Sequence, residues 1–255
     1  MIRIKKPEEI EKMRAAGKVV AQTLAGLASS IVPGKTTTKD LDDLAQSLLA
    51  NAGARASFKG YRGYPATICA SVNEEVVHGI PSPRVLKAGD VCGIDLGAIV
   101  NGYHGDAALT VPVGDISDEA KSLLRVTREA LFAGIEQARP GKRLGDISAA
   151  IQLYVERHGY SVVRDLVGHG IGKDMHEDPQ VPNFGRAGQG VQLKEGMTLA
   201  IEPMVNIGGP AIQTLLDHWT IVTRDRSLSA HFEHTVAITR NGPDILTLDT
   251  AEEAS

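Results

Sequence analysis

Four segments of the chain have the composition and period of helices. Their apolar residues recur every three or four positions, and the two longest segments are rich in alanine, leucine, glutamate and lysine. We predict helices over residues 7–30, 39–52, 118–138 and 144–158. The first opens with Lys6-Pro7-Glu8-Glu9, and proline followed by acidic residues is typical of a first helical turn.

Shorter segments with alternating apolar residues, bounded by turn residues, follow each pair of helices. This pattern is typical of β-strands. We predict strands over residues 67–72, 91–99, 107–113, 198–207, 219–223 and 234–239.

The chain resembles itself at a shift of 107 positions. Pro33-Gly34-Lys35 recurs as Pro140-Gly141-Lys142, and Leu86-Lys87 recurs as Leu193-Lys194. A constant shift over about a hundred residues indicates an internal repeat. We therefore predict one α+β domain over residues 1–255, made of related halves at about 10–115 and 118–245, with a frayed tail at 249–255.

The overall composition indicates a globular protein without an obvious polyanionic partner. The chain is 42% hydrophobic and 23% charged, with a net charge of -4 and no basic run, so we expect no dedicated nucleic-acid site and no anionic membrane as partner. No apolar stretch approaches the roughly 20 residues of a membrane span, and residues 1–11 lack the apolar centre of a secretory signal. We expect Cys69 and Cys92 to be reduced thiols in the cytoplasm.

The repeat places acids at equivalent positions in otherwise apolar strands. Asp95 of Gly-Ile-Asp-Leu-Gly corresponds to Glu202 of Ala-Ile-Glu-Pro-Met. A buried carboxylate is costly unless it is paired or binds a metal. Each half also has a second acid entering an apolar strand, Asp106 in the first and Glu233 in the second.

The geometry of the first acid pair follows from a predicted hairpin. Asn101-Gly102 is a strong two-residue turn signal, and such a turn sets Asp106 opposite Gly97 and Asp95 opposite Ala108. Asp95 and Asp106 then become diagonal neighbours on one face, with backbones about 7–8 Å apart. We expect Gly97, which has no side chain, to leave room between them for cations.

An imidazole extends this set of candidate ligands. His169 lies in Gly168-His169-Gly170-Ile171-Gly172, and we expect the glycines to let the backbone approach a site. Four carboxylates and one imidazole suit Mn, Fe, Co or Zn in a catalytic role, whereas the lack of thiolates argues against structural zinc. A lone strand aspartate usually caps a turn or pairs with arginine, but the repeat favours the metal interpretation for the set.

Seven motifs then carry a family resemblance that extends from about residue 4 to 248. They are Asn73-Glu74-Glu75-Val76-Val77-His78-Gly79-Ile80-Pro81, Ile94-Asp95, His104-Gly105-Asp106, Gly168-His169-Gly170-Ile171-Gly172, His176-Glu177-Asp178-Pro179, Ile201-Glu202-Pro203 and Phe232-Glu233-His234-Thr235. With these motifs the chain resembles the type I methionine aminopeptidases in their short bacterial form. The resemblance implies the pita-bread (creatinase/aminopeptidase) fold, with an antiparallel sheet inside two pseudo-twofold halves and helices outside.

The resemblance also implies roles for the metal-site residues. Asp95 would chelate one of two divalent ions (Co, Mn, Fe or Zn), Asp106 and Glu233 would bridge both, and His169 and Glu202 would complete the other. Two metals sharing a water lower its pKa and supply a hydroxide that attacks the scissile carbonyl. Glu202 would also move a proton to the leaving amine.

Further implied roles concern the peptide substrate. His78 would contact the scissile amide and His176 would stabilise the oxygen of the tetrahedral intermediate. The methionine pocket maps onto His78 and onto aromatic or sulfur-containing side chains: Tyr61, Tyr64, Cys69, Met175 and Trp219. Sulfur packs well against aromatic rings, which suits a thioether. Met175 stands where some relatives have an aromatic residue, and for Phe58 we favour core packing.

The remaining histidines receive simpler interpretations. We expect His104 to support the site without binding metal, and His234 to point to the opposite face of its strand. We expect the other three to lie in loops or at the surface: His158, His218 and His231. A Cys69 nucleophile with His78 as base would lack a third orienting group and would leave the four acids unexplained.

The predicted reaction is removal of N-terminal methionine from peptides and nascent proteins, with a small second residue preferred. The resemblance implies docking near the ribosome, and we expect a monomer. Two alternatives are a proline-specific peptidase of the same fold, which usually has an additional N-terminal domain, and a binding protein that has lost its metals.

Overall fold

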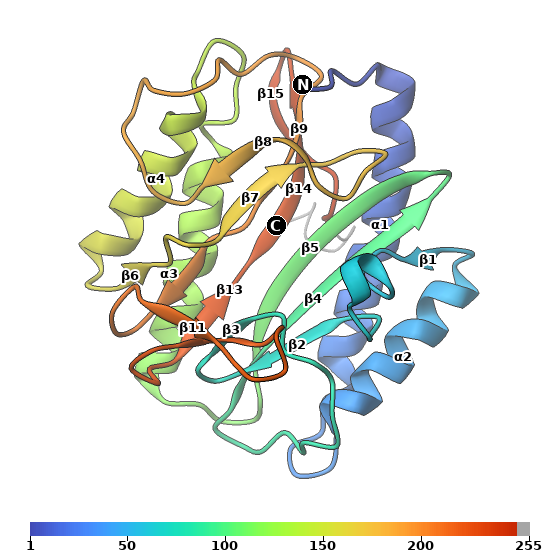
Figure 1. Cartoon of the computed structure of the whole chain (residues 1–255), viewed down its shortest axis with the longest axis vertical. Helices are drawn as coiled ribbons and strands as arrows, with labels where there is room; N and C mark the ends of the chain where they lie inside the picture. Colours follow the sequence, from blue (N-terminus) through green and yellow to red (C-terminus); the bar gives the residue numbers. More distant parts are fainter. Residues whose placement is uncertain (249–255) are drawn as a thin grey trace.

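Four long helices flank a central β-sheet in the computed structural model, which describes residues 1–248 (Figure 1). Helices α1 (Pro7–Ser30) and α2 (Thr38–Asn51) lie beside the first-half strands, and α3 (Asp118–Ile135) and α4 (Leu144–Arg157) beside the second-half strands. The four predicted helices are confirmed, but α3 ends three residues before the predicted end at 138. The predicted tail at 249–255 lies outside the described residues.

Local sequence determines where these helices begin. Thr37 caps α2, since its hydroxyl accepts from the Asp40 N–H at 3.0 Å and its own N–H donates to the Asp40 carboxylate at 2.8 Å. Ser117 caps α3 by accepting from the Ala120 N–H at 3.1 Å. Pro7 occupies the first turn of α1, where its missing N–H is not needed.

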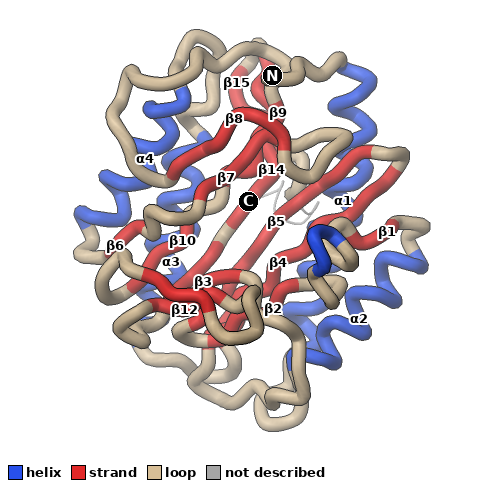
Figure 2. The backbone as a smooth tube through the Cα atoms, viewed as in Figure 1, coloured by secondary structure: helices blue, strands red, loops and turns tan. Residues whose placement is uncertain are grey.

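The central sheet runs through both halves of the chain. Its strands follow the spatial order β1-β4-β5-β14-β9-β7-β8, with β2 added to β4 and β15 added to β14. Their bounds are β1 (Arg55–Ala56), β2 (Cys69–Val72), β4 (Val91–Val100), β5 (Tyr103–Pro112), β7 (Val167–Gly170), β8 (Glu177–Pro182), β9 (Thr198–Ile201), β14 (Glu233–Thr239) and β15 (Gly242–Ile245). Figure 2 shows the strands gathered between the helices.

Two three-stranded sheets accompany the central one, in the orders β13-β10-β6 and β11-β12-β3. Their strands are β3 (Glu75–Val77), β6 (Ser161–Val162), β10 (Met204–Asn206), β11 (Ile212–Thr214), β12 (Ile221–Thr223) and β13 (Ser229–His231), and a short 3-10 helix spans Tyr61–Gly63.

The internal repeat is confirmed in the backbone hydrogen bonds. The Gly34 N–H donates to the Leu86 carbonyl at 2.7 Å, and the equivalent Gly141 N–H donates to the Leu193 carbonyl at 3.1 Å. Gly34 and Gly141 also share positive φ angles of 75° and 88°. The two Pro-Gly-Lys segments therefore form equivalent turns, each hydrogen-bonded to the equivalent leucine of its own half.

Alternation along the strands separates an apolar face from a polar one. Ile94, Leu96 and Ala107 pack into a buried cluster with α1 and α2. Leu199, Ile201 and Val236 pack into a second cluster with α3 and α4. The acids at positions 95, 106 and 233 alternate with these residues, so they lie on the face turned away from the helices.

The register of the β4–β5 hairpin agrees with the prediction. Asp106 lies opposite Gly97 and Asp95 opposite Ala108. The turn residues Asn101 and Gly102 have φ angles of 52° and 77°, the left-handed pair that a tight hairpin requires. The strand predicted over 107–113 begins earlier, at Tyr103, because pairing continues up to the turn.

One predicted strand is wrong. Residues 198–207 form two strands in different sheets, β9 paired with β14 and β10 paired with β13. Pro203 lies between them and has no N–H to donate to a ladder, so the pairing breaks there.

Within residues 1–248, no helix combines the length and apolar content that crossing a membrane requires.

We predict that Gly17→Ala in α1 lowers the free energy of unfolding by about 1–3 kcal/mol, because overpacking a filled site is destabilising. A Cβ at Gly17 would lie 2.1 Å from the Leu246 carbonyl oxygen. Urea denaturation measures the change. The matched control is Gly26→Ala in the same helix, where the nearest atom is the flexible Leu48 Cδ1 at 3.3 Å. The control should keep or gain about 0.5–1 kcal/mol, and equal losses in both variants would contradict the packing argument.

Candidate metal centre and active site

The five predicted donors come from five adjacent strands of the central sheet. In sheet order they are Asp95 on β4, Asp106 on β5, Glu233 on β14, Glu202 at the end of β9 and His169 on β7. Residues far apart in the sequence thus meet on one face of the sheet, and all five line the same cavity.

The strand register explains this convergence. Ala108 lies opposite both Asp95 and Glu233, so these two acids flank it across three strands. Ala200 lies opposite both His169 and Thr235 in the same way. Side chains directly across a sheet share a face, so these pairings turn Asp95, Glu233 and His169 to the same side of the sheet.

Four of the five predicted donors fall into two overlapping clusters, and Asp95 belongs to neither. Atoms of Asp106, His169 and Glu233 lie within 4.8 Å of one another, as do atoms of a second group: Glu202, His231 and Glu233. His169 Nε2 is 3.7 Å from Glu202 Oε1 and 4.0 Å from Asp106 Oδ2. Glu233 belongs to both clusters and thus lies at the centre of the set.

The glycines near these donors act differently from our expectation. A Cβ at Gly97 would lie 2.7 Å from the Ser57 Cβ, so Ser57 and Phe58 fill the space that we expected cations to use. A Cβ at Gly168 would lie 2.4 Å from the Ala200 carbonyl oxygen, and one at Gly170 would lie 2.2 Å from that of Asp178. These glycines let β7 fit between its neighbouring strands, and they do not bring the backbone nearer to the donors.

The carboxylates have no cationic partners among the described residues: Asp106 and Glu233 are buried, and Asp95 and Glu202 are partly buried. Within residues 1–248, no lysine or arginine lies within ion-pair distance of the four acids. Asp95 Oδ1, Asp106 Oδ1 and Glu233 Oε1 are buried and have no hydrogen-bond partner. Because buried charges are normally paired or bound to metal, this set fits divalent cations.

The electrostatics agree with that fit. Burial raises the pKa of Asp106 to about 7. Burial, followed by neighbouring negative charge, raises the pKa of the other three acids well above the ordinary range: Asp95, Glu202 and Glu233. Burial also lowers the pKa of His169 to about 4, which keeps its imidazole neutral and able to bind a metal.

Aromatic and sulfur-containing side chains form the apolar wall of the cavity, which has a volume of about 150 Å³. All the residues predicted for the methionine pocket line it, including Tyr64 and Trp219, whose rings meet edge to face at 5.1 Å. Cys69 lies directly opposite Asp95 on the neighbouring strand, and burial raises the pKa of its thiol, which disfavours a nucleophilic role. Phe58 is buried as expected but also lines the cavity.

Two histidines lie at the border between the donors and the apolar wall. The His176 ring is 4.2 Å from the His169 ring, and its Nδ1 lies 2.9 Å from the Tyr61 hydroxyl. Burial, followed by the neighbouring His169, lowers the pKa of His176 to about 3. His78 has a φ of 60°, and such backbone strain concentrates at functional sites.

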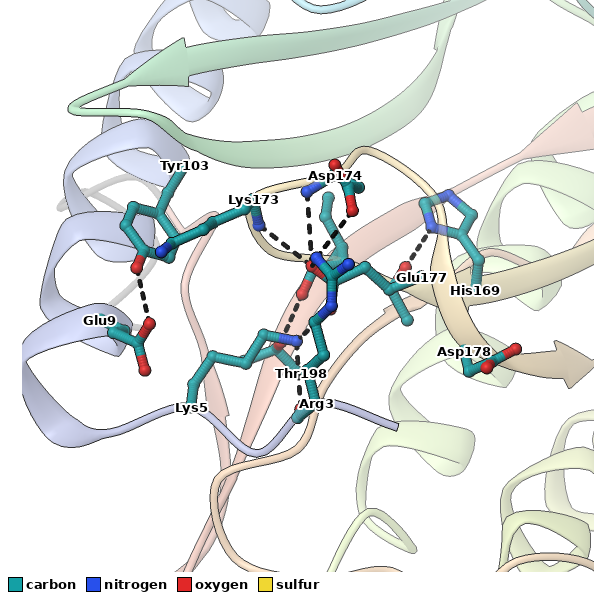
Figure 3. Close-up of polar contacts among 12 residues, drawn as sticks. Arg3, Lys5, Glu9, Tyr103, His169, Lys173, Asp174, Glu177, Asp178 and Thr198 are labelled. Carbon is teal, nitrogen blue, oxygen red and sulfur yellow. Dashed lines mark hydrogen bonds and ion pairs between the residues drawn. The ribbon is translucent and has the colours of Figure 1, made fainter. Parts of the chain in front are cut away.

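An ion-pair network anchors the loop that carries Met175 and His176 (Figure 3). Lys5 Nζ lies 2.6 Å from Glu177 Oε2, and the two side chains are only 5% and 3% exposed. Glu177 also accepts from the Lys173 N–H at 3.1 Å. The N-terminal segment therefore holds the residue that follows His176, which fixes the loop beside the cavity.

The interpretation of His231 as a surface or loop residue is wrong. Its side chain is 4% exposed, and its Nε2 lies 3.7 Å from Glu202 Oε2 and 3.9 Å from Glu233 Oε2. Burial lowers the pKa of His231 to about 3. The missed signal was the sequence Ser-Ala-His-Phe-Glu. Residues two apart in an extended segment share a face, so His231 lies on the same face as Glu233.

Three other histidines lie where they were expected: His158, His218 and His234. His158 and His218 are exposed. His234 contacts Thr247 at 2.9 Å and Phe132 of α3, on the face opposite to Glu233. His104 is buried, and its Nδ1 lies 2.9 Å from the Ser57 hydroxyl.

An antiparallel sheet that gathers carboxylates and an imidazole on its inner face is suited to metal-assisted hydrolysis. The model of metallopeptidase family M24 matches residues 11–240. The methionine aminopeptidase of Clostridium acetobutylicum is 58% identical over 249 residues, covering 97% of this chain and 99% of that protein.

Solved structures agree with this match. The crystal structure of a methionine aminopeptidase from Thermotoga maritima has a TM-score of 0.96 and 51% identity, and the match covers 98% of this chain and 100% of that one. The prolidase from Pyrococcus furiosus has a TM-score of 0.76 at 24% identity, covering 96% of this chain and 65% of that one, so it shares the fold. The chain belongs to metallopeptidase family M24, and the predicted pita-bread fold is confirmed.

We predict that Mn²⁺ binding releases more protons at pH 6 than at pH 8. Asp106, with a pKa of about 7, is largely protonated at pH 6 and must lose its proton to bind a cation. Titration calorimetry in buffers of different ionisation enthalpy counts the protons. Heats at pH 6 that do not depend on the buffer would contradict the prediction.

Proposed function

We propose that this chain is a metal-dependent aminopeptidase that removes the N-terminal methionine from peptides and newly made proteins. The observation that carries the proposal is the single cavity in which four carboxylates and His169 meet an apolar wall of aromatic rings and sulfur. One side of this cavity suits hydrolytic chemistry and the other suits a thioether side chain. The methionine aminopeptidases that resemble the chain over nearly its full length support this choice.

We propose that five side chains hold two divalent ions, drawn from Co, Mn, Fe or Zn. They are Asp95, Asp106, His169, Glu202 and Glu233. Buried oxygens without a hydrogen-bond partner on Asp95, Asp106 and Glu233 support the assignment. Divalent cations held there would lower the pKa of a bound water and polarise a carbonyl oxygen. Glu233 belongs to both donor clusters and Asp106 lies beside it, which suits these two residues to a shared position between ions.

Three residues are proposed to act on the peptide itself. The neutral imidazole of His176 is oriented by the Tyr61 hydroxyl at 2.9 Å and can donate an N–H to oxygen charge as it develops at the scissile carbonyl. His78, held at positive φ beside Trp219, can contact the scissile amide. Burial raises the pKa of Glu202, so this carboxyl can hold a proton and pass it to the leaving amine.

The substrate side chain is proposed to enter the apolar wall. Tyr61, Tyr64, Cys69, Met175 and Trp219 belong to one cluster beside the donors. The Tyr64 hydroxyl lies 3.0 Å from the Ile68 carbonyl and 3.1 Å from that of Gly79, so its polar atom is satisfied outside the pocket. The pocket thereby offers ring faces and sulfur to a methionine side chain.

The alternatives are less well supported. Prolidases share the fold, but the match covers only 65% of the Pyrococcus furiosus chain, and their low identity carries no substrate assignment. A metal-free binding protein would have no reason to keep four buried acids together.

The remaining proposals concern organisation and setting. We propose that residues 1–255 act as one catalytic domain, because one sheet continues through both halves. Cys69 and Cys92 are buried and unbridged, which suits the cytoplasm. A monomer acting on nascent chains near the ribosome is a proposal from the family resemblance.

We predict metal-dependent release of methionine from Met-Ala-Ser in the presence of Mn²⁺ or Co²⁺, and slower release from Met-Leu-Ser. A bulky second residue would meet the rim of the pocket, whereas alanine would not. Chromatography of free methionine measures both rates, and a chelator should abolish them. No release with any metal would favour the binding-protein alternative, and preferential cleavage of Leu-Pro-Ser would favour a proline-specific peptidase.

We predict that Asp106→Asn abolishes turnover and leaves the fold intact, because an amide keeps the shape of the side chain but removes a negatively charged ligand. Methionine release gives the rate, and urea denaturation gives the stability. The control is Asp244→Asn, which loses an ion pair with Arg14 at 2.6 Å far from the cavity and should keep its activity. Near-normal turnover of Asp106→Asn would refute its proposed role.

A further inference from the structure

The Glu202 carboxylate lies between two imidazoles. Its Oε1 is 3.7 Å from His169 Nε2, and its Oε2 is 3.7 Å from His231 Nε2. Each oxygen therefore has a different histidine as its neighbour. His169 belongs to the proposed donor set, whereas His231 has no role in it.

The backbone of Glu202 is fixed, but its carboxylate is not. The Asn183 side-chain N–H donates to the Glu202 carbonyl at 2.9 Å, and Ile201 pairs with His234 just before it. In contrast, no side chain or backbone N–H among residues 1–248 donates a hydrogen bond to the carboxylate, which is 14% exposed. Besides a bound cation, the groups close enough to orient this carboxylate are the two imidazoles at 3.7 Å.

His231 is held more firmly than Glu202. Its backbone N–H donates to the Thr110 hydroxyl at 2.9 Å, and that hydroxyl donates to the His231 backbone carbonyl at 2.9 Å. His231 also pairs with Met204 across β13 and β10. Its Nε2 is nevertheless buried without a hydrogen-bond partner. A buried ring on an anchored backbone, with one unsatisfied nitrogen, thus faces a carboxylate that has no hydrogen-bond donor.

We propose that His231 is a positioning residue for the reaction: its Nε2–H donates to Glu202 Oε2 and keeps Oε1 turned toward His169. This inference rests on the proposed function. The present separation exceeds a hydrogen bond of about 2.9 Å by about 0.8 Å, which a small rotation of the Glu202 side chain closes. Metal-binding carboxylates are generally oriented by such outer hydrogen bonds.

His231 also lies within 4.8 Å of ligand atoms of Glu202 and Glu233, so direct metal binding is the alternative that the test must separate from positioning. His231 approaches Glu202 from the Oε2 side, whereas the predicted donor His169 is nearer to Oε1. A carboxylate held from Oε2 presents one defined oxygen to the cavity. Without the donor, nothing holds Oε2, and Glu202 loses the orientation that ligation and proton transfer require.

The test compares two substitutions of His231. His231→Gln keeps an N–H donor but is a poor metal ligand, whereas His231→Leu has neither property. The control is His234→Gln, on the opposite face of the sheet. We expect His231→Leu to lower kcat about 10–100-fold with little change in KM, and His231→Gln to restore most of the activity. The control should match the parent.

A second readout is independent of turnover. Electron spin echo measurements on the Mn²⁺-loaded protein count coupled imidazole nitrogens, and we expect the same number in the parent and in both His231 variants. A nitrogen lost from both variants, with His231→Gln as inactive as His231→Leu, would make His231 a ligand and overturn the proposal. Parent-like activity of His231→Leu would overturn it as well, by reducing the residue to packing.

Two further conditions keep the result interpretable. If urea denaturation shows that His231→Leu is unfolded, His231→Asn is tested in its place. The asparagine side chain is shorter than that of glutamine, so its amide N–H lies farther from Glu202. His231→Asn should then be less active than His231→Gln, and equal rates of the two variants would contradict the proposal. If the parent releases no methionine, the proposed function fails. The affinity for Mn²⁺ still reports on Glu202, and His231→Leu should weaken that affinity more than His231→Gln does.

Discussion

The burial of four carboxylates in one cavity is the constraint on which the rest of the structure depends. They carry like charge, and no lysine or arginine within residues 1–248 is close enough to neutralise them. Their repulsion and desolvation oppose folding unless protons or cations compensate. The raised pKa values are the first form of compensation, and metal ions are the second. Cations bound among the acids would therefore stabilise the folded chain.

Holding the acids together requires a precise junction between the halves. Strands β5 and β14 pair through only two positions, Glu233 with Ala108 and His234 with Ala107. Threonine side chains extend that short ladder. The Thr235 hydroxyl accepts from the Asp106 N–H at 3.0 Å, and Thr110 bonds both backbone groups of His231. A slip of one residue would turn Glu233 toward the helices, so these bonds protect the site as well as the fold.

The sequence was sufficient for features that local chemistry or repetition determines. The Asn101-Gly102 turn set the β4–β5 register, and the shift of 107 located Glu202 from Asp95. Features that depend on distant packing were missed. Gly97 accommodates Ser57 and Phe58, which no local pattern reveals, and Pro203 splits a segment that reads as one strand. His231 was misplaced because its burial depends on pairing with Met204 and on Thr110 of the other half.

The two halves contribute similar acids to the cavity but different side chains to its apolar wall. The repeat relates Asp95 to Glu202, and each half adds one more acid from a neighbouring strand, Asp106 in the first and Glu233 in the second. The apolar wall has no such symmetry, since Tyr61, Tyr64 and Cys69 come from the first half, while Trp219 stands beside the β11–β12 hairpin of the second. A symmetric centre could not distinguish the ends of a peptide. An asymmetric wall of the proposed kind would, because a side chain held against it would fix which bond lies over the acids.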